Sequence, residues 1–318
     1  MTHWIIKYKP RRLDEIVGHE SIVKRMKSMV QDCSLPHLIV IGDTGVGKTV
    51  TVQCMFKEMI PPEHAKTLLL EIDVSDERSC KYVCSSVEHF IQIRLTSKSF
   101  KYKYVIIHKA DNMSENVQKE MHKIMDKYTA SCRFCFIFSK LQQIIETIQS
   151  HSVLFRFQKI KDKDLVFAMK RICVNEKINH TKSALNSIAT ISQGDIRRAI
   201  NNLQSAYYGY GKITNTIVKC MHEHTCHDIL EDIIKSCEKN NLINAYLLTQ
   251  QQVKNGFALI DMVQNIYYMI KCRNMNPLDK IDMLKKIGEV LTKHTDGSIT
   301  NLCYMNLLSL LSESSSTT

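Results

Sequence analysis

The residues whose types and spacing most directly indicate chemistry lie in IGDTGVGKT, residues 41–49. The stretch matches the pattern GxxxxGK[ST], in which glycines let backbone N–H groups turn toward phosphates. Lys48 would reach the β- and γ-phosphates, and the Thr49 hydroxyl would bind Mg²⁺. The alternative is a chance glycine turn, but the apolar run before the motif and the helical pattern after it favour a phosphate site at a helix N-terminus. We therefore predict a purine nucleotide site formed by Gly42, Asp43, Thr44, Gly45, Val46, Gly47, Lys48 and Thr49.

A second chemical position is the end of the apolar run KYVIIH, residues 103–108. Nucleotide-hydrolysing enzymes with this loop normally end a second strand with an acidic residue that holds Mg²⁺, and ATPases add a glutamate that polarises the attacking water. Here the run delivers His108 and Lys109. The nucleotide-binding pattern is thus combined with a strand end that lacks both carboxylates.

The stretch CMHEHTCH, residues 220–227, is the nearest approach to a zinc-ligand cluster. Alternating Cys and His side chains could supply ligands to zinc. Closed zinc sites usually pair their ligands as CxxC or HxxxH on two elements, a spacing that is not met here. A polar link between domains is the alternative, and we favour it.

Short β-rich runs separated by longer amphipathic segments must position the phosphate loop. They are HLIVI (37–41), TLLLEI (67–72), KYVIIH (103–108), RFCFIF (133–138) and VLFRF (153–157). This alternation predicts a parallel sheet covered by helices. After about residue 160 the apolar positions recur three and four apart, which predicts helices. Gly209 and Gly211 in YYGYGKIT suggest a boundary between a small helical domain and a final one.

Composition narrows the class of protein. The 318 residues carry a formal charge of +11, which favours an anionic partner such as nucleic acid, although solubility charge alone is the alternative. The 12 cysteines show no framework spacing and the start MTHWIIKYKP has no secretory core, so we expect a reduced cytosolic or nuclear protein. No apolar run is long enough for a membrane span, and we expect no membrane partner.

Five stretches together resemble the small subunits of replication factor C, the AAA+ machine that loads the sliding clamp onto primed DNA. They are WIIKYKPRRLDEIVGHE, LPHLIVIGDTGVGKT, VIIHKADNMS, IIETIQSHSVLFRF and GDIRRAINNLQS, and KKIGEVLTKHTDG extends the likeness. Within that family RRAINNLQSAYYGYG is most similar to the second small subunit. The resemblance implies an α/β P-loop AAA+ domain over 1–160, a helical lid over 161–210, an all-α collar over 211–312 and a disordered tail over 313–318.

The resemblance also implies roles for individual residues. The adenine pocket would include Tyr8, Pro10, Val17 and Gly18, and the sensor-2 arginine that touches the γ-phosphate would be Arg197. The hydrolytic positions depart from the family. Its DEAD box reads HKAD, so that His108 and Lys109 replace the metal-holding aspartate and the catalytic glutamate, and only Asp111 remains. Sensor 1 is Ser139, and His151 occupies the position of the arginine finger.

These changes spare the positions that bind nucleotide and affect those that serve hydrolysis. We therefore expect a subunit that binds ATP or ADP, with Mg²⁺, and hydrolyses ATP poorly or not at all. Lys109 could place its ammonium near the γ-phosphate in place of metal charge, or it could point to solvent, which we favour.

The resemblance implies DNA contact through the starts of two helices that follow the phosphate backbone. The candidate residues are Arg78, Lys81, Lys119, His122 and Lys123, while one family arginine is replaced by Cys84. Phosphate contacts of this kind give salt-dependent, sequence-independent binding. The alternative to DNA contact is that these side chains lie on helix faces exposed to solvent.

Three functions remain open from the sequence. The favoured one is a clamp-loader subunit of a hetero-pentamer that acts with the sliding clamp and primer-template DNA in replication and repair, in the nucleus or at a viral replication site if the source is viral. The second is an AAA+-derived scaffold in which nucleotide has no role. The third is an active ATPase that uses Asp111 or Asp76 for the metal.

Overall fold

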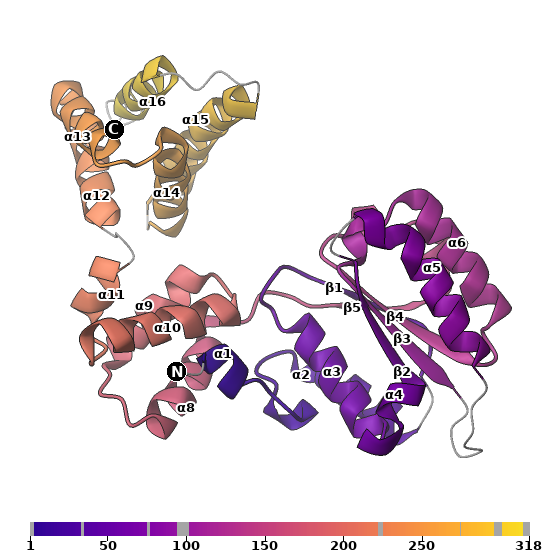
Figure 1. The fold of residues 1–318 in the computed structure, drawn as a ribbon. Coiled ribbons are helices and arrows are strands. Elements are labelled where there is room, and N and C mark those ends of the chain that lie inside the picture. Colours follow the sequence, from indigo (N-terminus) through magenta and orange to yellow (C-terminus); the bar gives the residue numbers. More distant parts are fainter. Residues whose placement is uncertain are drawn as a thin grey trace. The chain divides into compact units, whose positions relative to one another are not determined.

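The structure is a computed structural model that describes residues 3–32, 35–74, 77–93, 102–221, 225–273, 275–295 and 301–313. The chain divides into two compact units, Met1–Val218 and Lys219–Thr318. Among the described helices, none is long and apolar enough to cross a membrane. Figure 1 shows the fold, and the two units are described separately below.

A five-stranded parallel sheet forms the centre of the first unit, as the alternating pattern predicts. The strands are β1 (Leu38–Ile41), β2 (Leu69–Asp73), β3 (Lys103–His108), β4 (Cys132–Phe138) and β5 (Val153–Arg156). Their order is β2-β3-β4-β1-β5, and every neighbouring pair is parallel. The second strand begins later than the sequence suggests, because Thr67 and Leu68 belong to the short helix α4 (Ala65–Leu68).

Helices cover both faces of this sheet (Figure 1). On one face lie α5 (Glu77–Gln92), α6 (Glu115–Lys127) and α7 (Glu146–Ser150), and on the other α2 (Glu20–Gln31) and α3 (Lys48–Met59). Side chains alternate between the two cores along each strand: Val105 and Ile107 pack on the first face, Tyr104 and Ile106 on the second. Burial on both faces explains why these strands are continuously apolar.

Short helical segments complete the connections of the sheet domain. They are α1 (Trp4–Lys7), η1 (Leu13–Glu15), η2 (Pro62–His64), η3 (Ala110–Asn112) and η4 (Leu141–Gln143). The first of them packs against a later helix: the Trp4 indole lies 5.7 Å from the Tyr207 ring and 5.9 Å from the Tyr208 ring, and its backbone N–H donates to Gln204. The start of the chain is thereby attached to the helices that follow the sheet.

Four helices follow β5; the first three lie within the first unit, and the fourth begins in it and ends at Met221 of the second. They are α8 (Asp162–Asn175), α9 (Lys182–Ser192), α10 (Ile196–Tyr210) and α11 (Asn215–Met221). Side-chain oxygens cap two of them, because Thr181 accepts from the N–H of Ala184 and Asp195 accepts from the N–H groups of Arg197 and Arg198. Of the two glycines that suggest a boundary, Gly209 lies inside α10, and Gly211 ends it with φ 71°.

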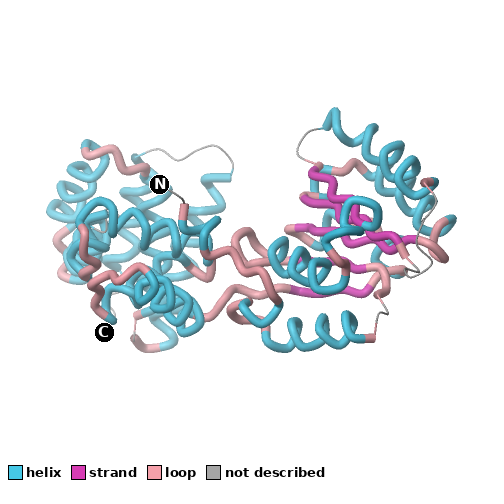
Figure 2. Tube along the Cα trace, turned by 60° about the horizontal axis from the view of Figure 1, so that its bottom comes forward, coloured by secondary structure: helices cyan, strands magenta, loops and turns pink. Residues whose placement is uncertain are grey.

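The second unit is helical over its described residues, as the sequence predicts. It contains α12 (Thr225–Glu238), α13 (Leu242–Lys254), α14 (Leu259–Cys272), α15 (Pro277–Thr295) and α16 (Asn301–Glu313). Figure 2 distinguishes these helices from the strands, all of which belong to the first unit. The unit has its own apolar core, formed by side chains such as Ile233, Ile266 and Leu307. Glu313 is helical, and 314–318 lie outside the described residues.

A buried histidine at the start of β1 gives the first unit a pH-dependent stability. His37 is 7% exposed, and its Nδ1 accepts from the N–H of Phe134 at 3.2 Å. Burial, followed by the charge of Arg133, lowers the pKa of His37 from 6.5 to about 4. Between these pH values the unfolded chain binds the proton and the folded chain does not, so the free energy of unfolding falls as the pH falls. The His37 contribution is about 3 kcal/mol across this range.

Urea denaturation at a series of pH values measures this contribution. His37→Asn keeps an acceptor near the Nδ1 position and cannot titrate, so its stability is expected to vary less between pH 6.5 and 4. The matched control is His89→Asn, at an exposed histidine of α5. If His37→Asn and wild type lose stability equally over this range, His37 is not the group responsible.

Candidate nucleotide-binding site

The phosphate loop connects β1 to α3 at the carboxyl end of the sheet, as the motif predicts. Gly47 precedes the helix with φ 97°, and α3 begins at Lys48. The Lys48 ammonium donates to the carbonyl of Asp43 at 2.8 Å and to that of Gly42. Burial lowers the pKa of Lys48, the charge of Arg197 lowers it further, and Asp111 and Asp43 oppose the change. These charges therefore surround the loop where a nucleotide's phosphates would bind.

Two glycines of the loop have neighbours that leave no room for a side chain. A Cβ on Gly42 would lie 2.5 Å from the carbonyl oxygen of Phe157. A Cβ on Gly45, where φ is 73°, would lie 1.9 Å from the Asp195 carboxylate. The N–H of Ile196 also donates to the Gly45 carbonyl at 3.2 Å. The start of α10, which includes Arg197, is thus in contact with the phosphate loop.

Gly42→Ala is expected to destabilise the first unit by about 1–3 kcal/mol, because the backbone of Phe157, directly after β5, must move to admit the methyl group. Gly209→Ala is the matched control, since no heavy atom lies within 4 Å of the added Cβ. That change replaces a glycine within α10 and is expected to stabilise by about 0.5–1 kcal/mol. Chemical denaturation measures both, and equal effects of the two substitutions would contradict the close packing at Gly42.

The residues assigned to the adenine pocket lie at the start of the chain. The Tyr8 hydroxyl donates to Glu176 at 2.7 Å, and Lys7 forms an ion pair with the same carboxylate at 2.6 Å. The hydrogen bonds from Lys7 and Tyr8 lower the pKa of Glu176. The Pro10 carbonyl accepts from the thiol of Cys54 on α3 at 3.3 Å. These contacts attach the segment to α3 and to the end of α8.

The remaining pocket residues lie beside the start of α2. A Cβ on Gly18 would lie 3.5 Å from Ile160 and 3.8 Å from the Asp164 carboxylate. Val17 is half-buried. His19 follows with φ 56°, its ring centroid is 4.8 Å from that of Phe157, and burial lowers its pKa despite a hydrogen bond with the Val46 backbone. Gly18 is therefore close to the start of α8, and the next residue, His19, contacts the phosphate loop.

The predicted Mg²⁺ ligand Thr49 lies in the first turn of α3 and is half-buried. Mg²⁺ usually keeps several waters and binds one or two protein ligands together with substrate phosphates. The Thr49 hydroxyl fits such a site as one ligand. The strand end that would provide a carboxylate ligand provides His108 and Lys109 instead.

Both replaced residues of the hydrolytic motif form contacts with carboxylates of β2. His108 Nε2 lies 3.2 Å from Glu71 Oε2, and Lys109 Nζ lies 3.2 Å from Asp73 Oδ2. Glu71 also accepts from Gln53 of α3 at 3.0 Å. The hydrogen bond with His108 is the main cause that lowers the pKa of Glu71. The Lys109 side chain is 60% exposed, and its ammonium is directed at Asp73.

The retained carboxylate of the motif, Asp111, accepts hydrogen bonds from the residue that follows β4. It accepts from the Ser139 N–H at 2.7 Å and from the Ser139 hydroxyl at 2.8 Å. Both oxygens are used, because Oδ2 also lies 2.9 Å from the same N–H. Asp111 and Ser139, the residue predicted at the sensor-1 position, therefore form one hydrogen-bonded unit. Asp76, the other carboxylate considered for the metal, lies outside the described residues.

The DNA candidates and the finger position lie away from this loop. Lys119 and Lys123 are exposed on α6, whereas the side chains of Arg78 and Lys81 lie outside the described part of α5. His122 of α6 and His151 at the end of α7 both contact Asp126. In the candidate zinc-ligand stretch 220–227, the structure describes the backbone of 220–221 and 225–227, and the Cys and His side chains lie outside the described part.

Sequence reasoning missed three residues around the nucleotide loop. Glu176 and Asp195 come from α8 and α10, and no periodicity connects them to Tyr8 or Gly45. The Asp195 helix cap was detectable, because Asp followed by an apolar helical pattern is a typical N-terminal signal. His19 follows Gly18 directly, but its contact with Phe157 depends on the folded chain.

Two protein families match the helical parts of the chain. Residues 168–208 match the family described as "RCF1/5-like, AAA+ ATPase lid domain". Residues 225–310 match "Replication factor C C-terminal domain". Among solved structures, the Thermotoga maritima RuvB Holliday junction branch migration motor has a TM-score of 0.54 over 71% of this chain and 79% of its own, at 16% identity. That likeness supports the AAA+ fold alone.

Similar whole proteins carry one family name. The chain is 29% identical to replication factor C subunit 4 of Schizosaccharomyces pombe, over 98% of this chain and 91% of the relative. It is 30% identical to the probable replication factor C subunit 2 of Dictyostelium discoideum, over 97% of this chain and 91% of the relative. It is 33% identical to the replication factor C small subunit of Sulfurisphaera tokodaii, over 93% of this chain and 90% of the relative. With its parallel P-loop sheet, its lid helices and its matched C-terminal domain, this chain belongs to the replication factor C small-subunit family of AAA+ proteins.

Proposed function

We propose that this chain is a clamp-loader subunit that binds ATP or ADP and hydrolyses ATP slowly or not at all. The proposal rests on the contrast between the retained nucleotide-binding residues and the replaced hydrolytic residues. Lys48 and Arg197 remain beside an intact phosphate loop, while His108 and Lys109 stand where hydrolysis requires carboxylates and contact Glu71 and Asp73 instead. The division supports a subunit whose nucleotide has a structural or regulatory role.

The binding half of the proposal follows from charge and geometry. Backbone N–H groups at the start of α3 and the Lys48 ammonium favour a polyphosphate. Lys48 now donates to two loop carbonyls, and these contacts would be exchanged for phosphate oxygens. Arg197 adds a second positive group from α10. Thr49 would hold Mg²⁺ together with water and phosphate oxygens.

The expectation of slow or absent hydrolysis rests on the replacement of the catalytic base and of the arginine finger. A positioned base typically contributes about 10²–10⁴-fold in rate. An arginine finger contributes about 10³–10⁵-fold in phosphoryl transfer. His151, at the finger position, would act on a neighbouring subunit's nucleotide rather than on its own. Its imidazole contacts Asp126 and lacks the fixed charge and planar fork of arginine.

The family supports a multi-subunit assembly. We propose that the chain functions in a hetero-pentamer that loads a sliding clamp onto primer-template DNA, in the nucleus, during replication and repair. The relatives reported above carry different subunit numbers, and assignment to the second small subunit remains our proposal. They come from a yeast, an amoeba and an archaeon and add no support for a viral source. The domain division 1–160, 161–210, 211–312 and 313–318 likewise remains a proposal.

DNA contact gives a measurable prediction for α6. If Lys119 and Lys123 each neutralise one phosphate, Lys119→Ala/Lys123→Ala should reduce the slope of log K against log salt concentration by about 2. The matched control is Lys24→Ala/Lys57→Ala, at exposed lysines of α2 and α3. Fluorescence anisotropy of labelled primer-template DNA with the assembled complex measures both. An equal effect of the two pairs would indicate general charge attraction.

Purification of the tagged full chain from its native cells, followed by mass spectrometry, tests the assembly. Recovery of four related AAA+ chains in equal amounts is the expected result. Recovery alone, or with unrelated proteins, would support the alternative of an AAA+-derived scaffold. ATP binding, measured on the same material, separates the two functions further, because the scaffold has no need to bind ATP.

A further inference from the structure

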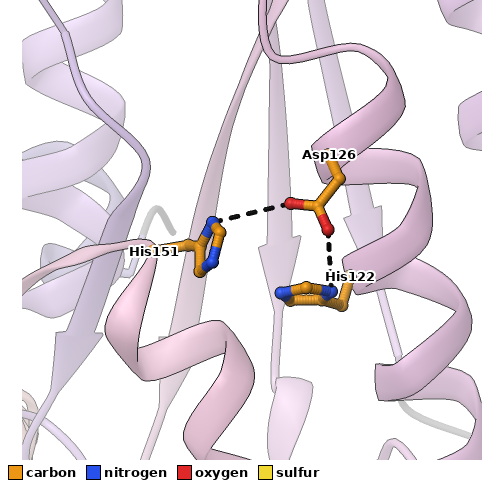
Figure 3. Close-up of side chains that lie close together, drawn as sticks. All are labelled: His122, Asp126 and His151. Atoms are coloured by element: carbon orange, nitrogen blue, oxygen red, sulfur yellow. Dashed lines mark ion pairs between the residues drawn. The ribbon is translucent and has the colours of Figure 1, made fainter.

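Two histidines and one aspartate form a compact cluster in the sheet domain, shown in Figure 3. His122 Nδ1 lies 3.2 Å from Asp126 Oδ2, and His151 Nδ1 lies 3.5 Å from Asp126 Oδ1. The two imidazole centroids are 4.9 Å apart, with their planes at 79°. One potential ligand atom from each residue falls within 4.8 Å of the others. We name these three residues the imidazole–carboxylate cluster.

Regular structure fixes the backbones of the three residues. His122 and Asp126 are four residues apart on α6, so they lie on the same face of the helix. Met121 and Met125, their neighbours in sequence, are buried in the core. His151 directly follows α7, where Ile148 is fully buried, and precedes β5. The cluster thus connects two separate segments at the amino end of the sheet, whereas the phosphate loop is at the carboxyl end.

The separations suit a small metal ion. Zinc with bonds of about 2.0–2.1 Å in a tetrahedron has ligand atoms about 3.3–3.4 Å apart. The distances from the two histidines to the Asp126 carboxylate, 3.2 Å from His122 to Oδ2 and 3.5 Å from His151 to Oδ1, bracket that value. A modest rotation of His151, whose side chain is 53% exposed, can bring its nitrogen closer to His122. Of the two imidazole rings, the more exposed His151 ring is therefore the one that would move.

The surroundings of His122 indicate which of its ring nitrogens would bind the ion. Its side chain is 18% exposed, and Nδ1 is directed at Asp126. Its other nitrogen, Nε2, is buried and has no hydrogen-bond partner among the described residues. Nδ1 is therefore the nitrogen available to a metal ion, and Nε2 would carry the proton of the neutral ring.

We propose that His122, Asp126 and His151 form a binding site for a divalent transition-metal ion, with Zn²⁺ the favoured occupant. Imidazole nitrogens suit zinc and its neighbours in the transition series, whereas Mg²⁺ and Ca²⁺ require mostly oxygen ligands. Three protein ligands leave a further coordination position, and the half-exposed Asp126 and His151 allow water to reach it. The ion would connect α6 to the turn between α7 and β5.

The proposal does not depend on nucleotide binding. The cluster and the phosphate loop lie at opposite ends of the parallel strands, because His151 precedes β5 whereas the loop follows β1. Loss of the metal ligands should therefore leave ATP affinity unchanged. Metal binding and nucleotide binding can be measured separately on the same full chain.

Titration of the reduced, chelator-treated full chain with Zn²⁺, followed by calorimetry, tests the site. One equivalent is expected to bind, and Tm should rise by about 5–10 °C at a free concentration 100-fold above Kd. His151→Ala, Asp126→Asn and His122→Gln should each weaken binding at least about 10-fold. The control His89→Ala removes an exposed histidine of α5 and should change nothing. Unchanged ATP affinity in the three variants would exclude misfolding as the cause.

The sequence contains a competing set of ligands in CMHEHTCH, residues 220–227. X-ray absorption of the zinc-loaded chain distinguishes the two, because zinc–nitrogen and zinc–oxygen distances are about 2.0–2.2 Å and zinc–sulfur distances about 2.3 Å. The proposal predicts a nitrogen and oxygen shell that persists in Cys220→Ser/Cys226→Ser. A sulfur shell, or loss of binding in that cysteine variant, would overturn it. Absence of stoichiometric binding would also overturn it and leave the cluster as hydrogen-bonded side chains only.

Discussion

Lys48→Ala is expected to weaken ATP binding by the full chain about 10- to 150-fold, equivalent to about 1.5–3 kcal/mol for hydrogen bonds to a charged group. The ammonium lies within the phosphate loop, where it donates to the Asp43 and Gly42 carbonyls. Phosphate oxygens would replace these acceptors, and no other lysine of α3 is next to the loop. Calorimetric titration with ATP measures the loss.

Lys57→Ala is the matched control for this prediction. Lys57 belongs to the same helix, is exposed and lies at the opposite end of α3. Its removal changes the net charge equally and should leave ATP affinity within about twofold, as expected for a surface substitution away from the site. If both variants bind as wild type does, the loop does not hold the nucleotide and the scaffold alternative gains support.

His108→Asp/Lys109→Glu is expected to raise ATP turnover by about 10²–10⁴-fold, the usual contribution of a positioned acid or base. The pair would restore a metal-holding carboxylate and a base at the end of β3. His108→Asn/Lys109→Gln is the control, because it changes size similarly without adding carboxylates. Release of phosphate under saturating Mg²⁺ and ATP measures all three proteins, and Lys48→Ala in the restored variant should abolish the gain.

The same double substitution has a second expected effect. His108 and Lys109 now face Glu71 and Asp73, so two new carboxylates would repel the existing ones. The restored variant should therefore melt at a lower temperature than wild type without Mg²⁺ and recover part of the loss with it. High turnover in wild type that depends on Lys48, with no gain in the variant, would contradict the assignment of these positions.

The phosphate site was the part of the molecule most accessible from sequence. Its glycines, Lys48 and Thr49 are consecutive, and their geometry depends on one strand, one turn and one helix. The strands were also predictable, because burial on both faces leaves continuous apolar runs. The apolar run predicts a strand at Thr67 and Leu68, which belong to α4, because such a run does not show whether its first residues continue a preceding helical turn.

The partners of the replaced residues could not be predicted. His108 and Lys109 contact Glu71 and Asp73 because β2 pairs beside β3, in a register that matches Asp73 with His108. Register between strands more than 30 residues apart follows from packing of the whole sheet. The imidazole–carboxylate cluster could not be predicted for the same reason. His122 and Asp126 are four residues apart on α6, but no local pattern connects them to His151.

Recovery of bound nucleotide tests the central claim of binding without hydrolysis most directly. The full chain would be incubated with Mg²⁺ and radiolabelled ATP, separated from free nucleotide at intervals of hours, and the bound nucleotide identified. We predict that it is recovered as ATP throughout, in an amount that Lys48→Ala reduces. Steady conversion of bound ATP to ADP, lost in Lys48→Ala, would contradict the account and identify the chain as an active ATPase.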